Sequence, residues 1–217
     1  MSHHMFHRAP RLALAHGLRL RRVLLLAAAT TVFAGALPAL AEACTVANAT
    51  STQAFKTFGD AASYTLAPGG SFESGTAGWS LSGARVQSGS ESYYVNSRSD
   101  SHSLVVPSTS QPISPPICVN SSMPTFRFFA RQVSGGWSEM NINVLWTDSS
   151  GVAHVTTAGG LAPSTSWGPT PVYNLAAMLG PLFQPGSTLS VRLQFVPASG
   201  GGAIAIDDLE VDPYRSS

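Results

Sequence analysis

Strict alternation of apolar and polar residues is the feature that most constrains this chain of 217 residues. Residues 140–147 and residues 189–195 both carry apolar side chains at every second position. A period of two is the period of a β-strand with one buried face, whereas a helix repeats every 3.6 residues. Each segment therefore predicts a strand whose polar side chains point away from a core. The polar faces carry Asn141, Asn143, Arg192 and Gln194.

Further short runs of β-prone residues are separated by Gly, Pro, Ser and Asn, which is the spacing expected of an all-β sandwich. Only residues 175–182 have a helical pattern, and Gly180-Pro181 limits that helix to one or two turns. In residues 125–133 the apolar alternation would leave Phe129 on the outer face, as an exception. The predicted strands are 64–66, 71–73, 79–87, 92–96, 103–106, 117–119, 125–133, 140–147, 152–157, 171–173, 188–196 and 203–211.

The N-terminal part has the pattern of a secretory signal, and we expect this segment to be disordered or helical. Five Arg and no acid occur in the first 22 residues, and residues 23–36 are apolar or small. Ala41-Glu42-Ala43 predicts cleavage before Cys44, with Ala39-Leu40-Ala41 as a second site. The alternatives are a signal retained as an anchor and a lipidated Cys44. We therefore expect a secreted, extracellular protein with no membrane span after residue 43.

The predicted organisation is a signal peptide (1–43), a lead-in (44–67), one sandwich domain (68–212) and a short tail (213–217). After cleavage the chain would carry seven basic and ten acidic residues, a formal charge of −3. No basic patch remains, which argues against nucleic acid as a partner.

The two cysteines, Cys44 and Cys118, predict one disulfide, because exported proteins fold in an oxidising compartment. Closing the 73 residues between them would stabilise the fold by about 4 kcal/mol in the chain-entropy model. The alternative is two separate buried thiols.

Two motifs occur at opposite ends of the predicted domain. Residues 70–79 contain Phe72-Glu73, followed by Gly75 and Gly78-Trp79, and residues 204–211 have the sequence Ile-Ala-Ile-Asp-Asp-Leu-Glu-Val. This pair resembles the galactose-binding-like jelly roll, and in particular the carbohydrate-binding modules attached to bacterial xylanases and glucanases. The chain from residue 44 is also similar to a family of uncharacterised secreted actinobacterial proteins. The resemblance covers residues 68–212 and implies a jelly-roll β-sandwich.

The resemblance also implies a structural calcium ion beside the first and last strands. Its ligands would be Glu73, Asp207 and backbone oxygens near Ser71, which suit a cation that prefers hard oxygen donors. The two adjacent acids at 207 and 208 interrupt the alternation of a core strand, which favours a β-bulge. The alternative is therefore a bulge whose carboxylates accept hydrogen bonds from backbone N–H groups or face an arginine.

Sugar binding by such modules uses aromatic rings beside planar polar side chains. Trp137 follows two glycines in an expected loop and is the first candidate, followed by Tyr93, Tyr94 and Trp167. The supporting polar set would be Asn141, Asn143, Arg192 and Gln194. The alternative is that the aromatic residues belong to the core or cover one end of the sandwich.

Support for catalysis is weak, and we expect a protein that is not an enzyme. The chain after residue 43 has two histidines, His102 and His154, and contains neither an H-x-x-x-H motif nor a G-x-S-x-G motif. The sequence thus predicts a secreted carbohydrate-binding module that acts on extracellular or cell-wall polysaccharide. The alternatives are a structural or adhesive exported sandwich without a glycan site and a small extracellular hydrolase.

Overall fold

The computed structural model describes residues 50–120, 125–179 and 188–212. The chain divides into two compact units, residues 1–37 and 38–217, and every described residue belongs to the second. The predicted signal peptide, its cleavage sites, Cys44 and the tail lie outside the described residues. In the part that is described, no helix is long and apolar enough to cross a membrane.

Two antiparallel sheets make up the fold. The larger sheet has the order β2 (Arg85–Ser88), β3 (His102–Val106), β11 (Ile204–Asp212), β5 (Thr125–Gln132) and β8 (Gly168–Pro169). Two short strands extend it, β1 (Thr65–Leu66) beside β11 and β9 (Tyr173–Asn174) beside β5. The smaller sheet has the order β4 (Ile117–Val119), β10 (Leu189–Pro197), β6 (Met140–Thr147) and β7 (Ala153–Leu161).

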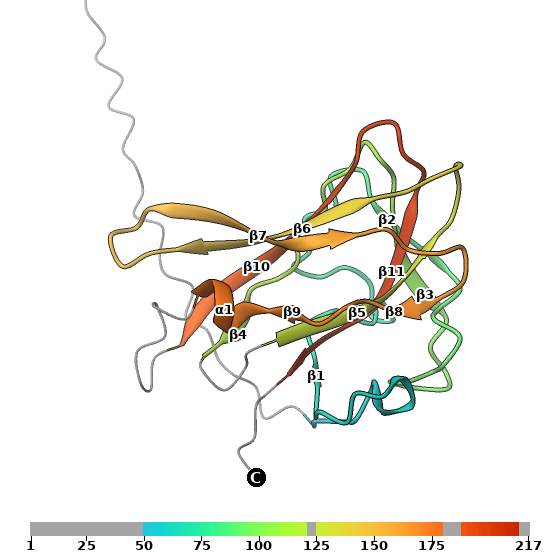
Figure 1. Ribbon diagram of the computed structural model, residues 1–217, viewed down its shortest axis with the longest axis horizontal. Coiled ribbons are helices and arrows are strands. Elements are labelled where there is room, and N and C mark those ends of the chain that lie inside the picture. The colour runs from blue at the N-terminus through green and yellow to red at the C-terminus, as the bar shows by residue number, and fades with distance from the viewer. Residues whose placement is uncertain (1–49, 121–124, 180–187, 213–217) are drawn as a thin grey trace, which may run out of the picture. The chain divides into compact units, whose positions relative to one another are not determined.

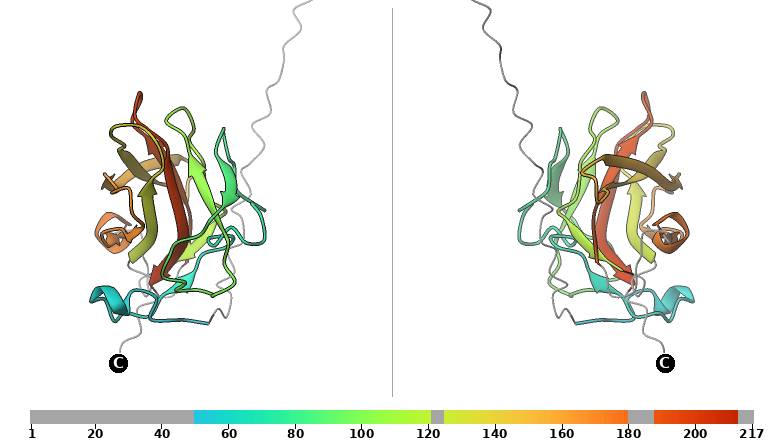
Figure 2. Two further views of the ribbon diagram at one scale, coloured as in Figure 1. Left: turned by 90° about the vertical axis from the view of Figure 1, so that its right-hand side faces the viewer. Right: turned by 90° about the vertical axis from the view of Figure 1, so that its left-hand side faces the viewer.

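Successive strands repeatedly cross from one sheet to the other, as between β3 and β4, β5 and β6, and β10 and β11. In Figure 1 the strands β6 and β7 lie in the upper layer, with β5, β8 and β9 below them. Figure 2 shows β2, β3, β11 and β5 side by side in the larger sheet. The prediction of an all-β jelly-roll sandwich is confirmed.

The main core lies between the sheets and is built from the alternating apolar positions of the sequence. Ile142 and Val144 of β6 and Leu193 and Phe195 of β10 are fully buried there. Phe72 and Trp79, from the first of the two motifs, are buried in the same cluster, and their ring centroids lie 5.1 Å apart. Such aromatic pairs bury large apolar areas, which is the main source of stability of a domain of this size.

A second, smaller apolar cluster covers the outer face of the larger sheet. Phe129 of β5 is buried there and stacks on Phe55 at 5.2 Å, which explains its position outside the main alternation. Tyr64 packs edge-on against Phe55 at 4.8 Å. The segment that carries these rings includes the 3₁₀ helix η1 (Lys56–Phe58) and runs beneath the lower layer in Figure 1. The lead-in is thus packed onto the sheet by aromatic side chains.

Several predicted strands are wrong. Residues 71–73 form a turn in which Phe72 has a φ of 59°, and residues 79–87 contribute only the short strand β2. Residues 171–173 are replaced by the two-residue strands β8 and β9, because Pro171 cannot donate to a ladder. Residues 92–96 form a loop, since the backbone N–H groups of Tyr93 and Val95 donate to the carboxylate of Glu91 instead of to a neighbouring strand. The helix α1 (Leu175–Leu179) is as short as predicted.

The predicted bulge is present in β11. The pairing of β11 with β5 shifts between Asp207, which is opposite Phe129, and Glu210, which is opposite Arg127. Asp208 has a φ of 42° at this point. Because of the shift, Asp207, Asp208 and Glu210 all lie on the side of the sheet away from the main core, whereas Ile206 and Leu209 remain in it.

Candidate functional site

The polar set predicted from the alternation lies together on the outer face of the smaller sheet. Asn143 of β6 is paired with Gln194 of β10 and with Thr157 of β7. The Asn143 amide donates to Gln194 at 3.1 Å and accepts from Thr157 at 3.0 Å. Gln194 in turn donates to Gln111 at 3.2 Å. These four residues form the polar row, which crosses three strands and ends at the exposed side chains of Gln111 and Thr157.

The two remaining polar candidates flank this row. Asn141 is exposed and lies two residues before Asn143 on the same face of β6, where it is paired with Val196 of β10 and Gly160 of β7. Arg192 lies on the other side of the row, opposite Leu145, and its guanidinium donates to the Ser114 carbonyl at 3.3 Å. All four predicted polar residues therefore belong to one surface. Gln111 and Thr157 were not predicted, because nothing in their local pattern indicates that they meet Gln194 and Asn143.

The first aromatic candidate, Trp137, lies in the loop between β5 and β6 and is 50% exposed. Its carbonyl accepts a hydrogen bond from Gly202, and its ring is so close to Gly201 that an added Cβ there would lie 3.3 Å away. Trp137 thus packs on the β10–β11 loop, beyond the end of β6 at which Asn141 lies.

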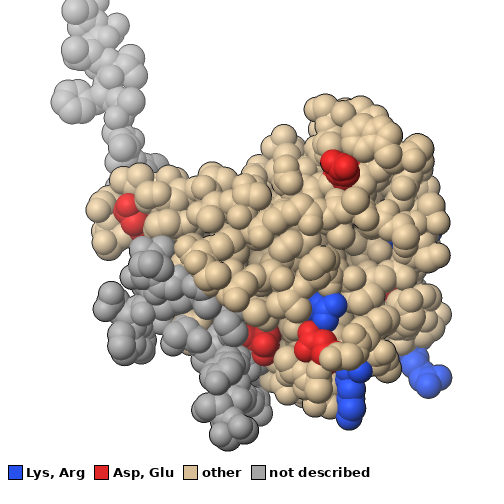
Figure 3. All heavy atoms as spheres, in the orientation of Figure 1, with Lys and Arg blue, Asp and Glu red and all other residues tan. Residues whose placement is uncertain are grey.

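In Figure 3 most of the visible surface carries no charge, and a few acidic and basic side chains are scattered over it.

The other aromatic candidates lie on the opposite layer. Tyr93 packs against Phe58 and Phe129 on the outer face of the larger sheet, with ring centroids 4.7 and 5.7 Å apart. Its hydroxyl donates to the Trp167 carbonyl at 3.1 Å. Tyr93 and Tyr94 are 47% and 50% exposed, and Trp167 is half-buried beside the second cluster. The fold therefore separates Tyr93, Tyr94 and Trp167 from the polar row.

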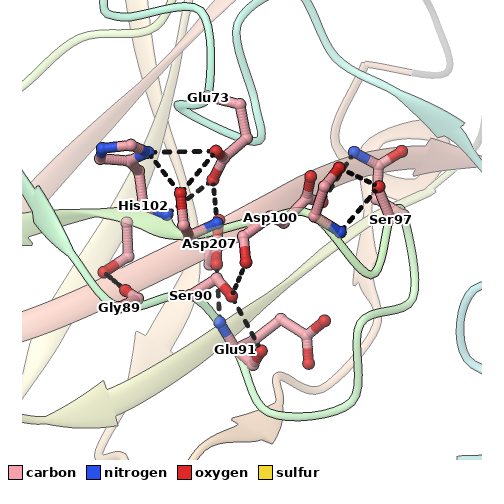
Figure 4. A network of polar contacts seen from close by, with 12 residues as sticks. Glu73, Gly89, Ser90, Glu91, Ser97, Asp100, His102 and Asp207 are labelled. Atoms are coloured by element: carbon pink, nitrogen blue, oxygen red, sulfur yellow. Dashed lines mark hydrogen bonds and ion pairs between the residues drawn. The ribbon is translucent and has the colours of Figure 1, made fainter.

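A group of carboxylates surrounds the bulge of β11. Figure 4 shows Glu73, Glu91, Asp100 and Asp207 close together, on segments that are far apart in the sequence. The Glu91 amide donates to Asp207 Oδ2 at 2.8 Å, and the Asp208 amide donates to Asp207 Oδ1 at 2.9 Å. Both oxygens of the Asp207 carboxylate thus accept hydrogen bonds from backbone N–H groups. This is the arrangement that the sequence analysis gave as the alternative to a metal site.

Glu73, the second predicted metal ligand, is held in a similar way. Its Oε1 accepts from the amides of Ser101 and His102 at 2.7 and 2.6 Å, and its Oε2 lies 3.0 Å from His102 Nδ1. Burial raises the pKa of Glu73, but the hydrogen bonds from His102 and Ser101 outweigh this, so the pKa lies below its ordinary value. The Glu73 carboxylate is therefore charged at neutral pH.

The unpartnered carboxylate of the group is that of Asp208. Both of its oxygens are buried and have no hydrogen-bond partner among the described residues. Burial, together with the charges of Glu91, Asp100 and Glu73, raises the pKa of Asp208 to about 8. Burial, and secondly the charge of Asp208, raises the pKa of Asp207 to about 9 and that of Glu210 to about 8. The described side chains contain no set of three or more His, Cys, Asp or Glu that could hold a metal ion.

Ser101, His102 and Glu73 include the residue types of a catalytic triad but differ from one in geometry. Ser101 Oγ and Glu73 Oε2 both lie 3.0 Å from the same ring nitrogen, Nδ1 of His102. A relay needs the nucleophile at one ring nitrogen and the acid at the other. This arrangement gives the serine no separate base.

One partner of the predicted disulfide, Cys44, lies outside the described residues. Cys118 is in β4, where it is paired with Ser190 of β10.

No protein-family model and no curated protein matches the chain. Among solved structures, a xylanase 10B fragment from Clostridium thermocellum, containing CBM22-1 and GH10 modules in complex with xylohexaose, aligns at 11% identity and a TM-score of 0.46. The alignment covers 68% of this chain and 28% of that one, so the chain spans less than a third of that fragment.

Two isolated modules align in the same way. The CBM22-1 xylan-binding domain of Paenibacillus barcinonensis Xyn10C has 15% identity and a TM-score of 0.46, with 68% of this chain and 93% of that one covered. The family 11 carbohydrate-binding module of Clostridium thermocellum Lic26A-Cel5E has 12% identity and a TM-score of 0.43, with 71% and 96% covered.

Proposed function

We propose that this chain is a secreted, non-catalytic glycan-binding module whose binding face is the outer face of the smaller sheet. The observation that carries the proposal is the polar row of Gln111, Gln194, Asn143 and Thr157. Amide and hydroxyl groups can both donate to and accept from sugar hydroxyls, and the mutual hydrogen bonds of the row hold these groups in place. Asn141 and Arg192 extend the row on both sides.

Trp137 supplies an aromatic surface at the Asn141 end of this face. Its exposed ring is supported by the β10–β11 loop through Gly201 and Gly202. A sugar chain that crosses the polar row along the strand direction and passes Asn141 would reach the ring, with its C–H face against the indole. We expect weak binding of short oligosaccharides, because ordering and desolvation offset much of the contact energy.

The test is affinity electrophoresis and calorimetry of the purified protein against a panel of neutral polysaccharides, including xylan and mixed-linkage glucan. Asn143→Ala should weaken binding at least tenfold, since Asn143 connects both halves of the row, and Trp137→Ala should do the same. Gln87→Ala is the matched control, because it removes an amide from β2 on the other sheet. Retention of full affinity by both Asn143→Ala and Trp137→Ala would exclude this face.

One observation favours the structural or adhesive alternative. The amides of the polar row satisfy one another, so they need no ligand to avoid an unpaired state. If no polysaccharide of the panel binds the wild-type protein, the row is a structural ladder, and the alternative replaces the proposal.

We also propose that a calcium ion can bind at the bulge of β11, with Asp208 as its principal carboxylate. The proposal rests on the two buried, unpartnered oxygens of Asp208; because the described side chains hold no set of three or more metal-ligating residues, the other ligands would not be carboxylates. Backbone carbonyls would complete the shell, since calcium takes six to eight oxygen ligands. The ion would supply structural charge neutralisation. Asp207, the residue expected from the sequence, would serve as the anchor of the 89–101 loop through Glu91.

A further inference from the structure

Arg131 of β5 is a cation that lacks an acceptor in the described structure. It lies on the outer face of the larger sheet, opposite Ala205 of β11, and its guanidinium carbon is 5.2 Å from the ring centroid of Trp167. Its Nε is buried and has no hydrogen-bond partner among the described residues. An acceptor from outside would therefore meet the two terminal guanidinium nitrogens, which are not among the buried unpartnered atoms.

Arg127, four residues earlier on the same face of β5, is an arginine whose donors all have acceptors. Its guanidinium donates to Asp60 at 2.7 Å and twice to the Thr170 carbonyl, at 3.0 and 2.7 Å. Arg131 has no such carboxylate or carbonyl among its described contacts. The difference indicates that the acceptor for Arg131 comes from outside the described chain.

The aromatic residues near Arg131 are the half-buried Trp167 and the exposed Tyr93, and both are held in place. The Tyr93 ring packs edge-on against Phe58, and its hydroxyl donates to the Trp167 carbonyl. The Trp167 ring in turn lies against the guanidinium of Arg131. About half of the Tyr93 surface still faces solvent. Trp167 thus connects the two groups, since its carbonyl accepts from Tyr93 and its ring lies against the guanidinium of Arg131.

We propose that Arg131, Trp167 and Tyr93 form a second binding site, specific for acidic sugars such as uronic acids. The guanidinium of Arg131 binds the carboxylate of the sugar in the two-pronged geometry that arginine favours. Tyr93 receives the C–H face of the pyranose, and Trp167 positions the guanidinium. A neutral sugar leaves the arginine without its acceptor and binds more weakly.

This site is separate from the polar row. Asn143 and its neighbours lie on the outer face of the smaller sheet, whereas Tyr93 packs on Phe129 on the outer face of the larger sheet. The proposal therefore does not rest on the proposed function of the polar row, and each site can be removed without the other.

The experiment is calorimetric titration of the purified protein, expressed from the full sequence, with galacturonic acid and galactose trimers at low salt. We expect the acidic trimer to bind at least tenfold more tightly than the neutral one. Arg131→Gln should weaken acidic binding at least tenfold, and Arg131→Lys should give an intermediate loss, because lysine keeps the charge but not the fork. Arg85→Gln is the control for charge, since Arg85 is exposed on β2.

Thermal unfolding of each variant checks that it is folded. Asn143→Ala should leave binding of the acidic trimer unchanged. Equal binding by wild type and Arg131→Gln would overturn the proposal, and so would loss of acidic binding in Asn143→Ala. Absence of binding to both galacturonic and glucuronic acid trimers at millimolar concentration would overturn it as well.

Discussion

The backbone amide of Glu91 donates a 2.8 Å hydrogen bond to the carboxylate of Asp207, across 116 positions of the chain. The Glu91 carboxylate in turn accepts from the amides of Tyr93 and Val95. The loop that presents Tyr93 is therefore fixed to the bulge of β11. Any change in the charge of the bulge acts on both the stability of the sandwich and the position of that loop.

The buried carboxylates of the bulge predict a stability that falls as the pH rises. The pKa values of Asp208 and Glu210 are raised to about 8 and that of Asp207 to about 9, from ordinary values of 3.8, 4.5 and 3.8. Between these limits the folded chain binds more protons than the unfolded chain, so protonation stabilises the fold. This stabilisation is complete below about pH 4 and is lost as the pH rises toward 8 or 9.

The measurement is the free energy of unfolding in chelator from pH 4.5 to pH 8.5, obtained by denaturant unfolding and compared with the melting temperature. Asp208→Asn should reduce the slope by about 1.4 kcal/mol per pH unit, because one titrating group is removed. Glu139→Gln, which changes an exposed carboxylate, should leave the slope unchanged. A melting temperature that rises from pH 5 to pH 8 in wild type would contradict the assignment.

Calcium should reverse the loss of stability at high pH. At pH 8 the ion binds the folded state at Asp208 and should raise the melting temperature by several degrees, since a ligand of the native state alone stabilises it. Asp208→Asn should abolish the rise, whereas Asp207→Asn should keep part of it. An equal effect of calcium on wild type and Asp208→Asn would show that the ion binds elsewhere. No effect on wild type would favour the alternative, in which the carboxylates of the bulge accept hydrogen bonds from backbone N–H groups and bind no ion.

The outer aromatic cluster should contribute as much as a core residue. Phe129 is fully buried between Phe55 and Tyr93, so Phe129→Ala should lower the free energy of unfolding by about 3–5 kcal/mol. Val155→Ala, at a largely exposed position of β7, should cost less than about 1 kcal/mol. Denaturant unfolding measures both. A small effect of Phe129→Ala would show that the lead-in does not stabilise the sheet.

The two strands predicted from strict alternation are confirmed, and so are the predicted strands 103–106, 117–119, 125–133 and 203–211. Residues 140–147 and 188–196 follow the pattern because one side of each strand faces the core, and this constraint is local to the strand. The same constraint isolated Phe129 as an exception, and the exception marks the second cluster. The alternation also placed Asn143 and Gln194 on one surface.

Long-range contacts could not be predicted from the sequence in this way. Tyr93 and Trp167 meet across 74 positions, and no local pattern indicates which sheet face they share. The second motif indicated a bulge with two acids, but the choice between Asp207 and Asp208 depends on the Glu91 amide, which arrives from a distant loop. The sequence predicted correctly that Trp137 lies in a loop. It did not predict where that loop lies relative to the polar row, because tertiary contacts determine the position of an exposed loop.

The predicted disulfide remains open to a direct test. Cys44→Ser and Cys118→Ser should each lower the free energy of unfolding by about 4 kcal/mol in the chain-entropy model, and the double variant should cost no more than either. Intact mass after alkylation without reduction checks the bond itself. Two alkylated thiols in the wild-type protein would refute it.

Arg127 should be irreplaceable by lysine, because it donates three hydrogen bonds to two acceptors at once. Its guanidinium donates to Asp60 and twice to Thr170, and it lies over the Phe55 ring at 4.4 Å from the centroid. Lysine can reach one of these acceptors and leaves the buried Thr170 carbonyl without its charged donors. Arg127→Lys should therefore lower the free energy of unfolding by about 2–3 kcal/mol, as measured by denaturant unfolding. Arg85→Lys, at an exposed position, should change it by less than about 0.5 kcal/mol, and an equally small effect at Arg127 would show that the contacts with Asp60 and Thr170 do not hold the lead-in to the sheet.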